Sequence, residues 1–225
     1  MIRGAVLLAF LLVPRLAAQE SGVDTQVFRW INHGQNPERN GFFEYLDLSS
    51  LPTFATVPIG FLVVGAIVEN PSTAFVGSMS AVGQITAFGI TTALKETFSR
   101  PRPFETLPDV LVKHRWSAHG NSFPSGHASQ AFSIATVIAL KYERASMTIP
   151  LFLWATSVGI GRIYLGLHYP SDVVGGMIVG IASGFVAWSL RADIQKFSTR
   201  IAGGHEILQF PIPDVTLLVV RIPYK

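Results

Sequence analysis

Three short blocks of polar residues have the composition expected of a site that handles phosphate. They are Lys95 followed by Arg102-Pro103, then Pro124-Ser125-Gly126-His127, then Arg162 followed by His168 and Asp172. A phosphoryl group in transfer spreads negative charge over three oxygens, which guanidinium groups match with paired donors. The serine can add a hydroxyl donor, and the glycine permits close approach of a backbone N–H at a helix start, where anions bind. We therefore expect a phosphate cradle made of Lys95, Arg102, Ser125, Gly126 and Arg162.

The two histidines and the aspartate supply the remaining groups for a displacement at phosphorus. His168 and Asp172 are four residues apart, a spacing that stacks side chains on a helical turn, although Pro170 predicts a helix start only near Ser171. Asp172 can accept the proton of one imidazole nitrogen and leave the other free to attack. His127 can then donate a proton to the leaving oxygen. In-line displacement requires the two imidazoles on opposite sides of the phosphorus.

Taken singly, each block has an ordinary structural explanation. Lysine and arginine at a membrane interface commonly anchor a helix, and Pro-Ser-Gly is commonly a turn with a helix cap. A His–Asp pair can be a simple cap as well. The combination is more specific, because all three blocks are expected at helix ends on one side of a membrane.

Together the blocks resemble the signature of the type 2 phosphatidic acid phosphatase family, which also includes bacterial non-specific acid phosphatases and vanadium haloperoxidases. That signature reads Lys-x6-Arg-Pro, Pro-Ser-Gly-His and Ser-Arg-x5-His-x3-Asp, and this chain matches ten of its eleven fixed positions. The departure is Gly161, where the family usually has serine, and it removes a possible hydroxyl donor to phosphate. The resemblance covers roughly residues 55–190.

The resemblance implies a helical bundle and hydrolysis in two steps, without a metal or another cofactor. In that scheme His168 forms a phosphohistidine with Asp172 as its partner, and His127 is the general acid. Water then hydrolyses the intermediate. The phosphate ligands that the resemblance implies are Lys95, Arg102, Ser125, Gly126 and Arg162.

The composition indicates which kind of scaffold must position these residues. Only 14% of the 225 residues are charged and 49% are hydrophobic, whereas soluble domains carry about 25% charged residues. This favours an all-α, integral-membrane helical bundle. The net charge of only +3 predicts no nucleic-acid surface. The absence of cysteine excludes disulfides, thiolate catalysis and cysteine metal sites.

The chain is expected to divide into four parts. Residues 1–18 have a basic start, an apolar run and the pair Ala17-Ala18, which predicts a secretory signal peptide or, alternatively, an uncleaved anchor. Residues 19–52 predict one or two short interfacial helices with a break at Asn36-Pro37. Residues 53–190 form the phosphatase bundle, and residues 191–225 form a tail to which no role is assigned. The five apolar segments expected to span the bilayer are 53–68, 74–94, 128–140, 149–161 and 173–190.

The signal-like start sets the expected orientation. Both explanations of residues 1–18 place Gln19 outside the cytoplasm, so five spans put the active-site loops 95–127 and 162–172 on the outer side. Lysine and arginine occur in the inner and the outer loops alike, so charge alone does not decide the topology. We therefore expect a multi-pass protein of a bacterial inner membrane whose site faces the periplasm.

The expected activity is removal of phosphate from a membrane lipid, whose tails stay in the bilayer while the head group enters the cradle. The sequence does not choose among undecaprenyl diphosphate, phosphatidic acid, phosphatidylglycerol phosphate and the lipid A 1-phosphate, and it sets no oligomeric state. The loop 104–123 is the first segment in which to seek head-group selection, through Phe104, Lys113, Arg115 and Phe123.

Two other classes of function stay open at this point. One is a soluble periplasmic acid phosphatase, or a haloperoxidase that holds vanadate in the same cradle, and the apolar segments argue against both. The other is a non-catalytic phospholipid-binding or transport protein. Gly161 is the only support for that reading, and the intact His127, His168 and Asp172 weigh against it.

Overall fold

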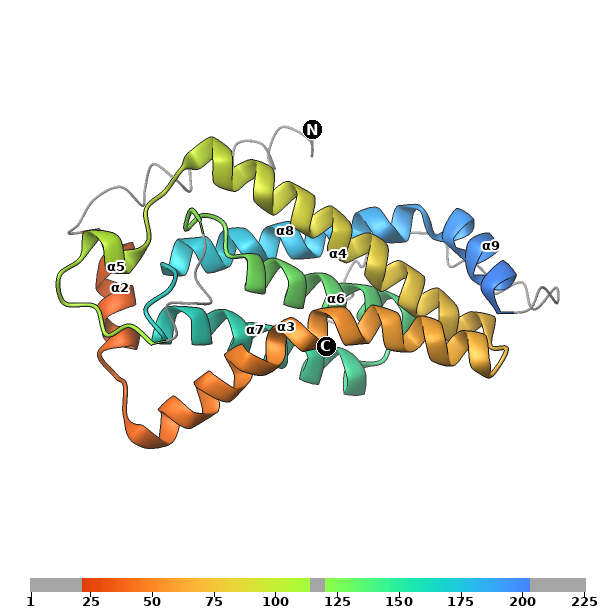
Figure 1. Cartoon of the computed structure of the whole chain (residues 1–225), viewed down its shortest axis with the longest axis horizontal. Helices are drawn as coiled ribbons and strands as arrows, with labels where there is room; N and C mark the ends of the chain where they lie inside the picture. Colours follow the sequence, from red (N-terminus) through yellow and green to blue (C-terminus); the bar gives the residue numbers. More distant parts are fainter. Residues whose placement is uncertain (1–21, 114–119, 203–225) are drawn as a thin grey trace, which may run out of the picture.

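The computed structural model describes residues 22–113 and 120–202, and within these ranges all regular structure is helical. The expected all-α class is confirmed there, whereas the expected signal segment 1–18 and the tail beyond residue 202 lie outside the described residues. Figure 1 shows the long helices lying side by side, with α2 and α5 at one end and α9 at the other. The helices are α2 (Val23–Asn32), α3 (Pro37–Ile67), α4 (Pro71–Phe98), α5 (Pro103–Thr106), α6 (Gly126–Tyr142), α7 (Ala145–Tyr164), α8 (Pro170–Ser189) and α9 (Arg191–Ile201).

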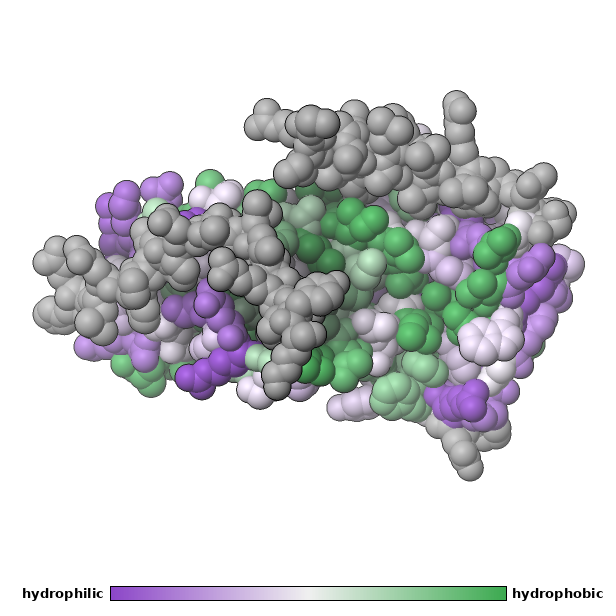
Figure 2. Space-filling model, turned by 180° about the vertical axis from the view of Figure 1, so that it is seen from behind, coloured by the Kyte–Doolittle hydropathy of each residue, from purple (hydrophilic) through white to green (hydrophobic). Residues whose placement is uncertain are grey.

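Among the described residues, three stretches are long and apolar enough to cross a membrane, judged by length and composition: Arg39–Ile67, Pro71–Thr106 and Pro170–Ser189. Much of the apolar surface of α3 faces away from the bundle, including Phe42, Leu51 and Ile67 at 54%, 51% and 75% exposure. Figure 2 shows hydrophobic side chains gathered over the middle of the molecule and hydrophilic ones toward its two ends. This distribution suits helices that contact lipid along their central part.

The first long helix differs from the expectation. Instead of a short interfacial helix followed by a span that starts at residue 53, α3 is continuous from Pro37 to Ile67 and includes Pro52 and Pro58. The polar residues of its first half suggested short interfacial helices, but Asp47 and Ser50 are buried in the bundle. The expected break at Asn36-Pro37 is confirmed, because the Asn36 side chain caps α3 by accepting the Arg39 N–H at 2.8 Å.

A seam of glycines brings α8 against α6. A Cβ atom at Gly176 would lie 2.4 Å from the carbonyl oxygen of Ser125, and one at Gly180 would lie 2.4 Å from that of Ser129. The two backbones are therefore in direct contact, as small residues permit between membrane helices. At the end of this seam the Ser125 N–H donates to the Asp172 carbonyl at 2.9 Å. The start of α6 is thus fixed against the start of α8.

The direction of the helices explains why the three sequence blocks meet. Helices α4 and α7 end where α6 and α8 begin, so two carboxyl ends and two amino ends lie at the same end of the bundle (Figure 1). Helices α2 and α5 cover that end. Each block of polar residues occupies one of these helix termini or the segment beside it.

Candidate active site

The structure brings the predicted site residues to this end of the bundle. Lys95 is in the last turn of α4 and Arg162 in the last turn of α7, while Arg102 directly precedes α5. The other predicted residues come from the start of α6, the loop before α8 and the first turn of α8, and they are Ser125, Gly126, His127, His168 and Asp172.

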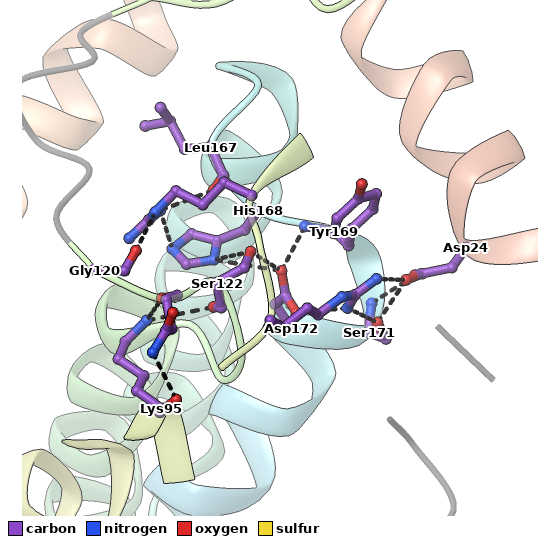
Figure 3. A network of polar contacts seen from close by, with 12 residues as sticks. Asp24, Lys95, Gly120, Ser122, Leu167, His168, Tyr169, Ser171 and Asp172 are labelled. Atoms are coloured by element: carbon purple, nitrogen blue, oxygen red, sulfur yellow. Dashed lines mark hydrogen bonds and ion pairs between the residues drawn. The ribbon is translucent and has the colours of Figure 1, made fainter. Parts of the chain in front are cut away.

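His168 is held through both of its ring nitrogens. Its Nδ1 lies 3.5 Å from Oδ2 of Asp172, and its Nε2 lies 3.2 Å from Nη1 of Arg102 (Figure 3). A guanidinium only donates hydrogen bonds, so Nε2 must accept, and the ring proton of the neutral imidazole therefore sits on Nδ1. The proton thus faces the aspartate, and the lone pair of Nε2 is on the side of the arginine.

The surroundings of His168 keep this imidazole neutral. The residue is only 2% exposed. Burial lowers the pKa of His168 well below its usual value, and the positive charges of Arg102, Lys95 and Arg162 lower that pKa further. A neutral ring with a lone pair on Nε2 can attack an electrophilic phosphorus.

The contact between His168 and Asp172 is made without the helical turn suggested by their spacing. Helix α8 begins at Pro170, and His168 lies before its N-cap residue, Tyr169. Asp172 is in the first turn, where its Oδ2 accepts the Tyr169 N–H at 2.8 Å. The cap thus places the carboxylate, and the backbone before it turns the imidazole toward that carboxylate.

Ser125 and His127 present buried polar atoms that make no hydrogen bond within the described residues. The Oγ of Ser125 and the Nε2 of His127 are both buried without a hydrogen bond. Buried polar atoms normally have hydrogen-bond partners, so these two atoms are candidates to bind a ligand. Beside them, a Cβ at Gly126 would meet only the Thr91 methyl, at 3.9 Å. There is therefore room at the start of α6 for an anion.

The same charges act on both histidines. Arg162, His168, Arg102 and Lys95 all act electrostatically on His127. Arg102 is fixed by donating from Nε to the Gly120 carbonyl at 2.9 Å and from Nη1 to the Leu167 carbonyl at 2.9 Å. Three cations and two imidazoles thus lie within electrostatic range of one another, as expected of a phosphate cradle.

Asp47 is a site residue that the sequence did not reveal. It lies on α3, it is 6% exposed, and its Oδ1 accepts a hydrogen bond from Nη1 of Arg162. The same oxygen lies 3.9 Å from Nε2 of His127. The sequence signal for Asp47 was an acidic residue in a segment that forms a membrane-length helix. A carboxylate in such a helix needs a buried partner.

Two further residues contact Asp172 and were also missed. The Ser122 hydroxyl donates to Oδ2 of Asp172 at 2.5 Å and lies 3.5 Å from Nδ1 of His168. Arg100 donates from Nη1 to Oδ1 of Asp172 at 2.6 Å. Lys95 lies close by, with its Nζ hydrogen-bonded to the carbonyl oxygen of Asn121. The only sequence signal for Ser122 and Arg100 was their position next to the predicted blocks.

The departure from the family signature at Gly161 has a local explanation. A Cβ at this position would lie 3.2 Å from Cδ1 of Phe43, so the phenyl ring of Phe43, on α3, crowds the space that a serine side chain would need. In the loop 104–123, Phe123 is 1% exposed and Lys113 pairs with Glu44 at 2.9 Å. Arg115 lies outside the described residues.

Comparison with known proteins places the chain among phosphatases. The PAP2 superfamily profile matches residues 75–196. A lipid A 4'-phosphatase of Bacteroides thetaiotaomicron is 37% identical over 194 residues, which cover 80% of this chain and 81% of that protein. The bacitracin transport permease protein BcrC of Bacillus licheniformis is 34% identical over 139 residues, which cover 57% of this chain but only 64% of that protein. The crystal structure of Aquifex aeolicus LpxE aligns with a TM-score of 0.65 at 28% identity and covers 76% of this chain and 98% of that one.

These matches agree with the sequence blocks. The profile spans all three of them, from Lys95 to Asp172, and accounts for more than half of the chain. The lipid A 4'-phosphatase extends the similarity to four fifths of the chain. The resemblance found in the sequence is therefore confirmed, and the chain belongs to the PAP2 superfamily.

Proposed function

We propose that this chain is a membrane phosphatase that hydrolyses a lipid phosphate or diphosphate, with His168 as its nucleophile. The observation that carries the proposal is the arrangement of the His168 ring, with Nδ1 toward Asp172 at 3.5 Å and Nε2 toward Arg102 at 3.2 Å. A phosphate held by Arg102 would lie beside this nitrogen lone pair, as attack on phosphorus requires.

The reaction would proceed in two displacements. In the first, Nε2 of His168 forms a bond to phosphorus while the bond from phosphorus to the lipid oxygen breaks, and His127 donates a proton to that oxygen. In the second, His127 takes a proton from a water molecule, whose oxygen attacks phosphorus and breaks the bond to nitrogen. Asp172 stabilises the positive charge of the phosphorylated ring in between.

The phosphate oxygens would be held by the cations and by two donors at the start of α6. Three positive charges offset the charge that spreads over the phosphoryl oxygens in the transition state. The hydroxyl of Ser125 and the backbone N–H of Gly126 lie at the start of α6, where an anion is favoured. The full set of proposed phosphate ligands is Lys95, Arg102, Ser125, Gly126 and Arg162.

The proposed setting is the bacterial inner membrane. Helices α3, α4, α6, α7 and α8 would form five spans after a signal segment at 1–18, with the site facing the periplasm. The substrate's tails would remain in the bilayer, while its head group reaches the bundle end. Because a relative named as a lipid A 4'-phosphatase matches 80% of this chain, a lipid A phosphate is the first substrate to test. The other candidates are undecaprenyl diphosphate, phosphatidic acid and phosphatidylglycerol phosphate.

The test is phosphate release by the purified full chain in detergent micelles across these four lipids. We expect turnover of at least one lipid and none by His168→Ala, whose helical content should equal that of the wild type. Wild-type enzyme that is denatured at alkaline pH during turnover should carry an acid-labile phosphoryl group that the variant lacks. Full activity of His168→Ala would end the nucleophile assignment, and an inert wild type on every lipid would reject the lipid phosphatase function.

A further inference from the structure

A chain of charged contacts runs from α2, the first helix of the described residues, to the carboxylate beside His168. Oδ1 of Asp172 accepts from Nη1 of Arg100 at 2.6 Å, and Nη2 of Arg100 donates to Oδ2 of Asp24 at 2.8 Å. Figure 3 shows these contacts extending from Asp24 on α2, past Ser171, to Asp172 and His168. The proposed mechanism uses neither Arg100 nor Asp24.

The position of Arg100 is set from several sides. Its side chain is 11% exposed and bridges two carboxylates. Nη1 also donates to the Ser171 hydroxyl at 2.7 Å, and the guanidinium lies over the Tyr169 ring with its central carbon 4.0 Å from the ring centre. A planar group held at its edge and on its face has little rotational freedom. It therefore fixes the orientation of any carboxylate that it binds.

Asp24 connects α2 to the start of α8. Its Oδ1 accepts the Ser171 N–H at 2.9 Å, and its Oδ2 accepts the Ser171 hydroxyl at 2.6 Å. It thus acts as an N-cap supplied by another helix, at a terminus that favours negative charge. Its side chain is only 10% exposed. One carboxylate therefore fixes both Arg100 and the first turn that carries Asp172.

The orientation of Asp172 matters because its two oxygens have different partners. Oδ2 faces Nδ1 of His168 and accepts from Ser122 and from the Tyr169 backbone, whereas Oδ1 is bound by Arg100. Loss of the arginine would leave Oδ1 of a fully buried carboxylate without this donor. The group would then rotate or shift toward another cation of the site, and the hydrogen bond that orients the imidazole would change.

We propose that Asp24 and Arg100 are positioning residues for the nucleophile, with Asp24 fixing Arg100 and Arg100 fixing the carboxylate that orients His168. The inference rests on the proposed function, because it assigns these residues to the reaction at His168. It also makes α2 part of the active site, although Asp24 precedes the residues 75–196 that match the superfamily.

The test compares two ion pairs of the same helix. Asp24→Asn and Arg100→Gln break the chain that leads to Asp172. The control Arg29→Gln breaks the ion pair between Nε of Arg29 and Oδ2 of Asp109, which are 2.9 Å apart. This pair joins α2 to the segment after α5 and does not contact the site. All variants are purified as full chains in detergent micelles, and their helical content is compared by circular dichroism.

In the kinetic readout, kcat should fall about tenfold in Asp24→Asn and about 10²-fold in Arg100→Gln, because small displacements of a reacting group have effects of this size. KM should stay within about twofold, since the phosphate ligands are unchanged. Asp24→Glu, which keeps the charge, should retain more activity than Asp24→Asn. The control should keep the kcat of the wild type.

The second readout does not need turnover. The Nδ1 proton of His168, followed by NMR in protein labelled at histidine nitrogens, should shift or be lost in Asp24→Asn and stay unchanged in Arg29→Gln. An unchanged resonance together with unchanged kcat in Asp24→Asn would overturn the inference, as would an equal loss of kcat in Arg29→Gln. A wild type that is inert on every lipid but shows the expected NMR pattern would reject the proposed function and still support the positioning role.

Discussion

Removing the carboxylate of Asp47 should destabilise the protein far more than removing an exposed one. The side chains of Asp47 and Arg162 are each 2% exposed and are hydrogen-bonded to each other. Breaking such a buried pair from one side costs about 3–5 kcal/mol, because the remaining charge stays buried. At about 2–4 °C per kcal/mol for a chain of this size, Asp47→Ala should lower Tm by about 6–20 °C.

The assay is thermal unfolding of the purified full chain in detergent micelles, followed by circular dichroism. The matched control is Asp109→Ala, which removes a carboxylate that is 41% exposed and paired with Arg29. Exposed pairs contribute about 0–1 kcal/mol, so Tm of this control should move by at most about 4 °C. The double variant Asp47→Leu/Arg162→Met removes both buried charges and should recover most of the lost stability.

Two results would refute this reasoning. One is a Tm of Asp47→Ala equal to that of the wild type, which would mean that Arg162 does not depend on this carboxylate. The other is a double variant whose loss equals the sum of the losses in Asp47→Leu and in Arg162→Met, because independent sites are additive and coupled ones are not. Neither result depends on which lipid the protein hydrolyses.

Three further predictions concern the reaction and the Gly161 position. Burial and the charges of Arg102, Lys95 and Arg162 lower the pKa of His168, so its imidazole should stay neutral below pH 6.5. The measurement is kcat/KM against pH, corrected for the ionisation of the substrate. A loss of kcat/KM that is already complete at pH 6.5 would contradict this prediction. Gly161→Ser should lower Tm, because its Cβ would lie 3.2 Å from Phe43, and adding Phe43→Leu should restore it; a single variant as stable as the wild type would show that the ring moves freely. EDTA should leave phosphate release unchanged, and inhibition that Mg²⁺ reverses would reject the metal-independent scheme.

The parts of the site that lie at helix ends were predictable from the sequence. Long apolar segments separated by polar loops indicate helices that alternate in direction, so the blocks at Lys95, Ser125 and Arg162 were expected on one side. The structure brings these blocks together, with one difference. The contact between His168 and Asp172 is set by Tyr169, the N-cap residue of α8, and not by a helical turn.

The acidic partners of the cations could not be predicted in the same way. Asp47 and Asp24 lie 115 and 147 residues from the partners they contact, Arg162 and Ser171. Single acidic residues in mixed segments form no local pattern, and the mixed character of residues 19–52 suggested short interfacial helices. Packing against other helices decides which face of α3 points into the bundle. The sequence of that segment has no hydrophobic periodicity that would predict this face.

The location of Asp24 and Asp47 limits how far the site can be transplanted. Every residue of the three-block signature falls within 75–196, so this segment looks sufficient as a unit to graft onto another helical bundle. A graft of that kind would import Arg162 without Asp47, and it would import Arg100 with Asp172 but without Asp24. An engineer who wants the reaction elsewhere must therefore supply two acidic side chains from the host scaffold as well.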